Sequence, residues 1–160
     1  MRHWLMKSEP DVFSIDGLAA QPRQTAAWDG VRNYQARNML RDDMRRGDLA
    51  FFYHSSCAVP GVVGIMEITR TAYVDPSQFD PAGPYYDPRS SPDKPRWYMV
   101  DVTLVRRFPR IVTLTEMRAD PVLSGMLALR RGNRLSITPV TTAEWERVLA
   151  LAAMCMSGHS

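Results

Sequence analysis

The sequence predicts an α+β domain: a small, mixed and mostly antiparallel β-barrel with helices packed on its outside. Three observations indicate this class. Strand-like segments outnumber helical ones, they are short and bounded by turn residues, and helical patterns fall near both ends of the chain. The 160 residues suffice for one domain with a real core, and 45% hydrophobic with 23% charged residues is typical of a globular protein.

The first strand is predicted over residues 3–7, which alternate in polarity and end before Pro10, because proline cannot donate to a central ladder. Residues 11–20 then indicate one or two helical turns, with Asp11 or Ser14 available as the N-cap. Residues 21–25 form a connector that leads to Trp28.

The stretch 28–41 organises the rest of the chain. Asn33 is a good N-cap for a helix predicted to run to about Arg46, with Gly47 placed to stop it. Arginines recur every four residues on one face of this helix, at 37, 41 and 45. An indole beside an amide and guanidinium groups suits an anionic ligand with a planar ring, such as a nucleotide. Two alternatives stay open: Trp28 as a core or loop anchor, and the arginines as a solvated face.

The middle of the chain is predicted to hold two paired strands. Residues 48–55 and 62–69 are apolar runs joined by the turn at Pro60 and Gly61, which favours an antiparallel pair. Gly64 inside the second run indicates a bulge or a close approach to the backbone.

Residues 75–95 contain six prolines and therefore predict a long loop. Loops of this length inside a domain tend to be functional. The clearest strand follows over residues 97–105.

The C-terminal part is predicted to alternate short elements. In order, these are a basic turn at 106–110, a strand at 111–113, helical turns at 114–117 and 121–129, a second basic turn at 130–134, and a strand at 135–137 that stops before Pro139. A capping box from Thr141 to Glu144 begins the last helix. We predict one domain over residues 1–154 and a polar tail over 155–160.

Composition restricts the functions open to the chain. The net charge of +3 allows a few phosphate contacts but argues against a protein that coats long polyanions. The two cysteines and three histidines are too scattered for a zinc site or a disulfide framework, so we expect no metal and no cofactor. Without a spanning run or signal pattern we expect a cytoplasmic protein that does not bind membranes, and we expect a monomer.

Several motifs, in order along the chain, resemble the EVE domain family. The matching segments are 4–10 (WLMKSEP), 28–38 (WDGVRNYQARN), 52–55 (FYHS), 86–90 (YDPRS), 95–97 (PRW) and 135–140 (LSITPV). The resemblance covers nearly the whole chain up to the last helix, which makes it more specific than any single short pattern.

This resemblance implies a PUA-like barrel, related to YTH domains, and a non-catalytic module that recognises a modified base, methylated or hydroxymethylated cytosine in DNA, after flipping it into an aromatic pocket. It implies that Trp28 walls this pocket. The other implied pocket residues are Lys7, Ser8, Asn33, His54, Ser55, Trp97 and Ser136, with Arg32, Arg37 and Arg96 nearer the phosphates. As a pocket wall, Trp28 should tolerate replacement by alanine at a cost of about 1–2 kcal/mol in stability while binding is lost.

Two other functions stay open. One is an RNA-binding PUA-like module. The other is a small hydrolase that uses His54 and Ser55, with Glu9, Asp29 or Asp101 as an orienting carboxylate. Against the hydrolase, neighbouring strand residues point to opposite faces, and the chain lacks a G-x-S-x-G elbow.

Overall fold

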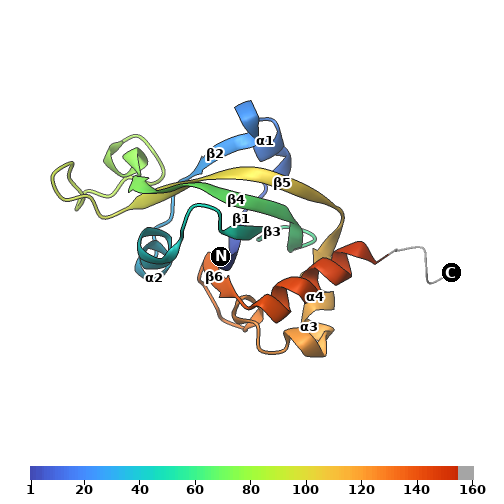
Figure 1. Cartoon of the computed structure of the whole chain (residues 1–160). Coiled ribbons are helices and arrows are strands. Elements are labelled where there is room, and N and C mark those ends of the chain that lie inside the picture. Colours follow the sequence, from blue (N-terminus) through green and yellow to red (C-terminus); the bar gives the residue numbers. More distant parts are fainter. Residues whose placement is uncertain (155–160) are drawn as a thin grey trace.

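The computed structural model describes residues 1–154 and shows a six-stranded sheet with the strand order β2-β5-β4-β3-β1-β6. The strands are β1 (His3–Ser8), β2 (Thr25–Trp28), β3 (Leu49–His54), β4 (Gly61–Val74), β5 (Tyr98–Thr113) and β6 (Ile137–Val140). β1 and β3 pair in parallel, and every other neighbouring pair is antiparallel. The α+β class and the mostly antiparallel pairing are therefore confirmed (Figure 1).

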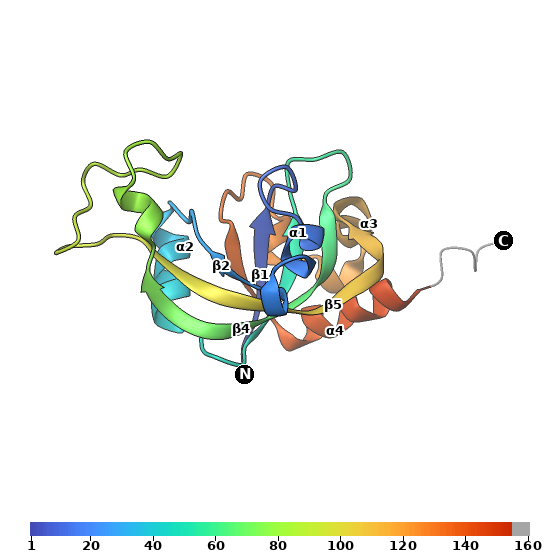
Figure 2. The ribbon, with the colours of Figure 1, turned by 90° about the horizontal axis from the view of Figure 1, so that it is seen from above.

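The predicted closed barrel is wrong, because β2 and β6 are the two edges of an open sheet. The sheet is nevertheless curved. β4 and β5 are 14 and 16 residues long, and their pairing shifts register at four places. Each such irregularity bends and twists the strands, and Figure 2 shows the resulting bow of β4 and β5.

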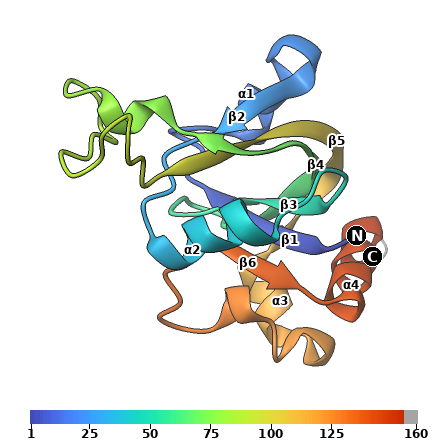
Figure 3. The same ribbon diagram turned by 60° about the vertical axis from the view of Figure 1, so that its left-hand side comes forward.

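Within residues 1–154, four α-helices accompany the sheet: α1 (Ile15–Ala19), α2 (Tyr34–Asn38), α3 (Leu114–Ala119) and α4 (Thr142–Ala153). They contribute to two separate apolar cores. Trp4 and Met6 of β1 belong to the core shared with α1 and α2, whereas Leu5 between them belongs to the core under α3 and α4. Both faces of the sheet are therefore buried, since successive strand residues point to opposite sides. Figures 1 and 3 show α3 and α4 together, away from α1.

The predicted helix over 33–46 is shorter than expected. A π-helical turn, Met39–Asp43, continues α2, and Met44 is already extended with φ −68° and ψ 136°. The Asp48 carboxylate accepts a hydrogen bond from the Arg45 backbone N–H at 2.9 Å, which turns the chain toward β3. Gly47 has a φ of +94°, but it serves this turn and does not cap the helix.

Two prolines lie inside strands where turns or strand ends were predicted. The basic turn at 106–110 and the strand at 111–113 are both part of β5, and Pro109 falls where the pairing with β4 shifts register. Its missing N–H therefore costs no ladder bond. Pro139 is tolerated within β6 because β6 is an edge strand.

Several local predictions are confirmed. A Cβ atom at Gly64 would meet the Arg106 carbonyl oxygen and the Ile15 side chain, so the expected close approach is real. Ser14 caps α1, and Thr141 opens α4 with a full capping box. The proline-rich segment forms a loop that projects beyond the sheet between β4 and β5, with one short 3-10 turn, Pro76–Phe79 (Figure 2).

The predicted tail, with Cys155 and His159, lies outside the described residues. Within residues 1–154, no helix has the length and apolar character needed to cross a bilayer. The same part of the chain holds no group of three or more His, Cys, Asp or Glu side chains arranged for a metal ion.

We predict that Glu116→Gln lowers the free energy of unfolding by about 2 kcal/mol at pH 7. Arg110 binds the Glu116 carboxylate through two nitrogens at 2.8 and 2.7 Å and also donates to the Leu151 carbonyl, which ties α3 to α4. The hydrogen bonds from Arg110 lower the pKa of Glu116 from 4.5 to about 2. A depressed carboxyl pKa stabilises the fold above its unfolded value and loses that effect as pH falls through the folded value.

Chemical denaturation of both proteins across pH checks this prediction. The difference should be complete above pH 4.5 and shrink as the pH falls toward 2. Glu144→Gln is the matched control, because Glu144 fills the same capping-box position but has no arginine ion pair within residues 1–154. Equal losses in the two variants would show that the Arg110 pair is unimportant.

Candidate functional site

A cavity of about 700 Å³ opens where β1, β2 and β3 end. This volume lies within the range of small-molecule sites in proteins. Its walls come from five separate parts of the chain, and they mix aromatic, amide, hydroxyl and charged groups. The residues that define it are Lys7, Ser8, Glu9, Val12, Phe13, Ala27, Trp28, Asp29, Gly30, Val31, Arg32, Asn33, Ser55, Ser56, Tyr85, Asn133, Arg134, Leu135 and Ser136.

Six of the eight residues predicted for a base pocket line this cavity: Lys7, Ser8, Trp28, Asn33, Ser55 and Ser136. His54 and Trp97 do not. The Nε2 atom of His54 accepts a hydrogen bond from the Ile15 backbone N–H at 3.1 Å, which holds the start of α1 against β3. His54 is therefore a structural contact, although Ser55 next to it reaches the cavity.

Trp28 lies at the end of β2 and has a double role. Its ring meets Phe52 edge-on at 5.2 Å and Phe13 edge-on at 6.1 Å between centroids, and only 6% of the residue is exposed. The remaining surface borders the cavity. Trp28 is thus both a core residue and a cavity wall, so its replacement by alanine should cost more stability than the roughly 1–2 kcal/mol predicted for a pocket wall alone.

Two residues of the lining carry hydrogen-bond donors. The Asn33 side-chain oxygen caps α2 by accepting from the Ala36 N–H at 3.0 Å, as predicted, which leaves its amide NH₂ as a donor. Lys7 provides an ammonium group, and burial, with the nearby charge of Arg118, lowers its pKa. The Ser8 hydroxyl already donates to the Phe13 carbonyl at 2.7 Å, so toward a ligand it acts as an acceptor.

Carboxylates face the same cavity. Glu9 follows Ser8 directly, and Asp29 follows Trp28. Burial raises the pKa of Asp29, and the negative charge of Asp75 adds to this shift. Carboxylate oxygens accept hydrogen bonds from amino groups such as cytosine N4, so the cavity can bind both donors and acceptors on a flat heterocycle.

Sequence reasoning missed the pocket contribution of Tyr85, which belongs to the long proline-rich loop. Its ring packs so closely on Gly30 that a Cβ atom there would lie 2.7 Å from Cζ. Gly30 also has a φ of +78°, which favours glycine. The loop was expected to be functional, but its composition did not single out Tyr85.

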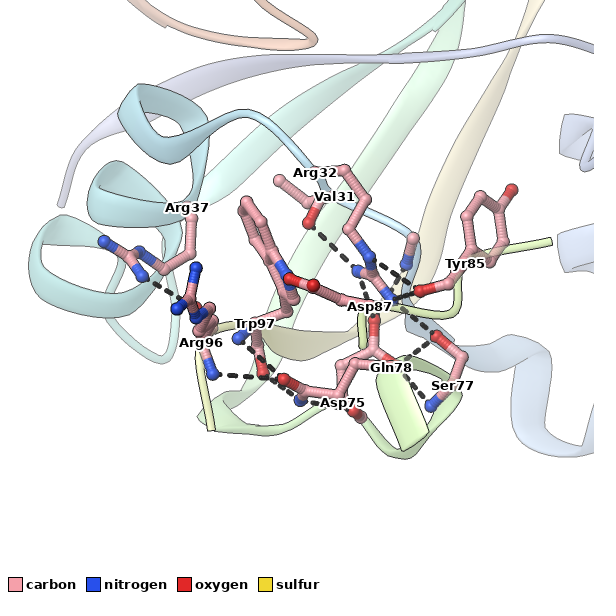
Figure 4. A network of polar contacts seen from close by, with 11 residues as sticks. Val31, Arg32, Arg37, Asp75, Ser77, Gln78, Tyr85, Asp87, Arg96 and Trp97 are labelled. Atoms are coloured by element: carbon pink, nitrogen blue, oxygen red, sulfur yellow. Dashed lines mark hydrogen bonds and ion pairs between the residues drawn. The ribbon is translucent and has the colours of Figure 1, made fainter. Parts of the chain in front are cut away.

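Arg32, predicted to contact phosphate, is engaged in an internal network shown in Figure 4. Its guanidinium forms an ion pair with Asp75 at 3.2 Å and donates to the Tyr85 carbonyl at 3.0 and 2.8 Å. The Asp75 side chain is fully buried and also accepts from the Gly30 N–H at 2.9 Å. Burial raises the pKa of Asp75, but hydrogen bonds from Ser77, Gly30 and Arg32 outweigh it and lower the pKa overall.

Trp97, Arg37 and Arg96 lie outside the cavity and attach the same loop to α2. Trp97 stacks on Tyr34 at 4.7 Å and donates from Nε1 to Asp87 at 2.7 Å. Arg37 donates to the Arg96 carbonyl at 2.7 Å, and the Arg96 side chain reaches the Tyr34 hydroxyl at 3.1 Å. These residues build a support for the loop, and any phosphate contact by the two arginines stays a prediction.

Comparison with known proteins gives one consistent family. The model of the EVE domain matches residues 2–151. Human thymocyte nuclear protein 1 is 47% identical over 167 aligned residues, which span 93% of this chain and 73% of that protein. The corresponding chicken protein is 48% identical and spans 93% of this chain and 68% of its own length.

Solved structures agree with this. A crystal structure of a Pseudomonas putida protein has 49% identity and a TM-score of 0.89, covering 94% of this chain and 99% of that one. Human THYN1 in complex with DNA containing 5-methylcytosine has 46% identity and a TM-score of 0.92, covering 97% of this chain and 99% of that one.

Proposed function

This chain belongs to the EVE domain family, and on that premise we propose that it is a non-catalytic DNA-binding module that recognises a modified cytosine. The modified base is held in the cavity beside Trp28. One observation carries the proposal: the family motifs at residues 4–10 and 28–38 converge on a single cavity with both aromatic and hydrogen-bonding walls. The human relative that crystallised with 5-methylcytosine DNA supports the choice of ligand.

The energetics of this proposal are feasible. Extruding a base costs a few kcal/mol of lost stacking and pairing. An aromatic platform returns about 1–3 kcal/mol per base, and phosphate contacts add the rest. Because little of Trp28 is exposed, the base gains its contacts from several walls, including Phe13 and Tyr85.

The polar lining suits the edge of cytosine. Asp29 and Glu9 accept from the exocyclic amino group, while Lys7 and Asn33 donate to the ring carbonyl and nitrogen. These groups determine which base binds. The substituent on C5 of the cytosine is recognised by the size and shape of the space that remains in the cavity.

We expect a modest preference for a methyl mark and a sharper one for a hydroxymethyl mark. Burial of one methyl carbon contributes about 0.8 kcal/mol, which corresponds to roughly fourfold in affinity. A hydroxyl that gains a hydrogen bond discriminates more strongly. Titration of otherwise identical DNA oligonucleotides that carry cytosine, 5-methylcytosine or 5-hydroxymethylcytosine checks this.

Identical dissociation constants across that series would overturn the proposal. A matched RNA oligonucleotide belongs in the same experiment, because tighter binding to RNA would favour the RNA-binding alternative. The hydrolase alternative is disfavoured by geometry. His54 Nε2 is occupied by the Ile15 N–H and lies outside the cavity that Ser55 lines, so the imidazole is not placed to activate that hydroxyl.

A further inference from the structure

A second, smaller hollow of about 290 Å³ is lined by α3 and by the segment that leads from α3 to β6. Three arginines dominate its lining, namely Arg118 of α3 with Arg130 and Arg131 of the following loop. All three are exposed. The remaining lining residues are Leu123, Ser124 and Leu129.

These arginines have no acidic partner within residues 1–154, where no carboxylate oxygen lies within 4.0 Å of their guanidinium nitrogens. The acidic residue of this region, Asp120, is already paired with Arg147 at 2.7 Å. Arg118 is held in place by a hydrogen bond from its Nε to the Leu129 carbonyl at 3.3 Å. The hollow therefore carries an excess of positive charge, and the Arg118 side chain is fixed in position.

The hollow and the cavity are lined by neighbouring parts of one loop. Arg130 and Arg131 line the hollow, and Asn133, Arg134 and Ser136, a few residues later in the same loop, line the cavity. A second link exists between Lys7 in the cavity and Arg118, because the charge of Arg118 contributes to the lowered pKa of Lys7. Positive charge thus continues from the cavity into the hollow.

We propose that Arg118, Arg130 and Arg131 bind the DNA backbone beside the recognised nucleotide, so that phosphates run from Arg134, which lines the cavity, into this hollow. The inference rests on the proposed function and extends it to the path of the strand. Guanidinium forks bind phosphate oxygens through two nitrogens. This basic surface replaces the phosphate contact predicted for Arg32, whose guanidinium is occupied by Asp75 and the Tyr85 carbonyl.

The test is the double variant Arg130→Glu/Arg131→Glu, titrated with a 5-methylcytosine DNA oligonucleotide at several salt concentrations. We expect at least about tenfold weaker binding at low salt. The slope of the logarithm of the affinity against the logarithm of the salt concentration should fall in magnitude by roughly 1.8, since each neutralised phosphate contributes about 0.9 in duplex DNA. Free 5-methyl-2′-deoxycytidine, followed by NMR, should bind the variant as it binds the unmodified protein, because the nucleoside lacks phosphates.

The matched control is Arg45→Glu/Arg46→Glu. Arg45 and Arg46 are also adjacent and exposed. They lie just before Leu49, which begins β3, whereas the cavity lies where β3 ends. This control should keep its affinity and its salt slope. Thermal unfolding of both variants confirms that each is folded.

Three outcomes can be distinguished. A selective loss of oligonucleotide binding in Arg130→Glu/Arg131→Glu supports the path. Unchanged oligonucleotide affinity and slope in that variant, or equal losses in the control, overturn the path and leave the proposed function intact. If the protein without substitutions binds neither the oligonucleotide nor the nucleoside, the proposed function and the proposed path of the DNA strand are both overturned.

Discussion

Replacement of Trp28 by alanine is expected to weaken binding of a 5-methylcytosine oligonucleotide by about 10- to 100-fold, because an aromatic wall contributes roughly 1–3 kcal/mol per base. The same change should lower the free energy of unfolding by about 3–5 kcal/mol, the usual cost of truncating a buried tryptophan. Edge-on contacts with Phe52 and Phe13 are lost together with the cavity wall. Chemical denaturation and titration well below the melting temperature measure the two effects separately.

Trp145→Ala is the matched control. Trp145 is as buried as Trp28, at 5% against 6% exposed, but it packs on Phe51 in the other core and does not line the cavity. It should lose similar stability and keep its affinity for DNA while folded. Unchanged binding by Trp28→Ala, or an equal loss of binding by Trp145→Ala, would remove Trp28 from the site.

The strands were predictable where local pattern decides them. β1 and β3 are apolar runs bounded by polar or turn residues, and burial of both faces explains why β3 reads as continuous. β2 escaped prediction because Thr25, Ala26 and Ala27 carry little strand signal, and their pairing with β5 imposes the extended form. Whether a sheet closes depends on which edges meet, and no local pattern contains that information.

The candidate site was predictable for residues close to a motif and not for those supplied by distant segments. Lys7, Trp28 and Asn33 lie at the ends of strands and helices. Polar side chains are common at such ends. The resemblance to the EVE domain family implied phosphate binding for Arg32. Its buried partner, Asp75, is 43 residues away in a loop of unknown path, so the competing role became visible only in three dimensions.

Replacement of Arg32 by alanine is expected to lower the free energy of unfolding by about 3–5 kcal/mol, because it leaves the buried Asp75 carboxylate without its countercharge. The lost donors to the Tyr85 carbonyl should also loosen the loop that carries Tyr85 to the cavity. Denaturation of Arg32→Ala, of Asp75→Ala and of Arg32→Ala/Asp75→Ala measures this. The double variant should be less destabilised than the sum of the two single changes, since the two groups interact directly.

Arg2→Ala is the control for this experiment, because the Arg2–Asp43 pair is exposed and 3.9 Å long, and exposed pairs contribute at most about 1 kcal/mol. The salt dependence of DNA binding then separates two roles for Arg32. If Arg32 only positions the loop, the slope of log affinity against log salt concentration is unchanged in the folded variant. If Arg32 contacts a phosphate, the magnitude of that slope falls by roughly 0.9. A variant of full stability with the lower slope would restore Arg32 as a phosphate-binding residue and show that the loop does not depend on its ion pair.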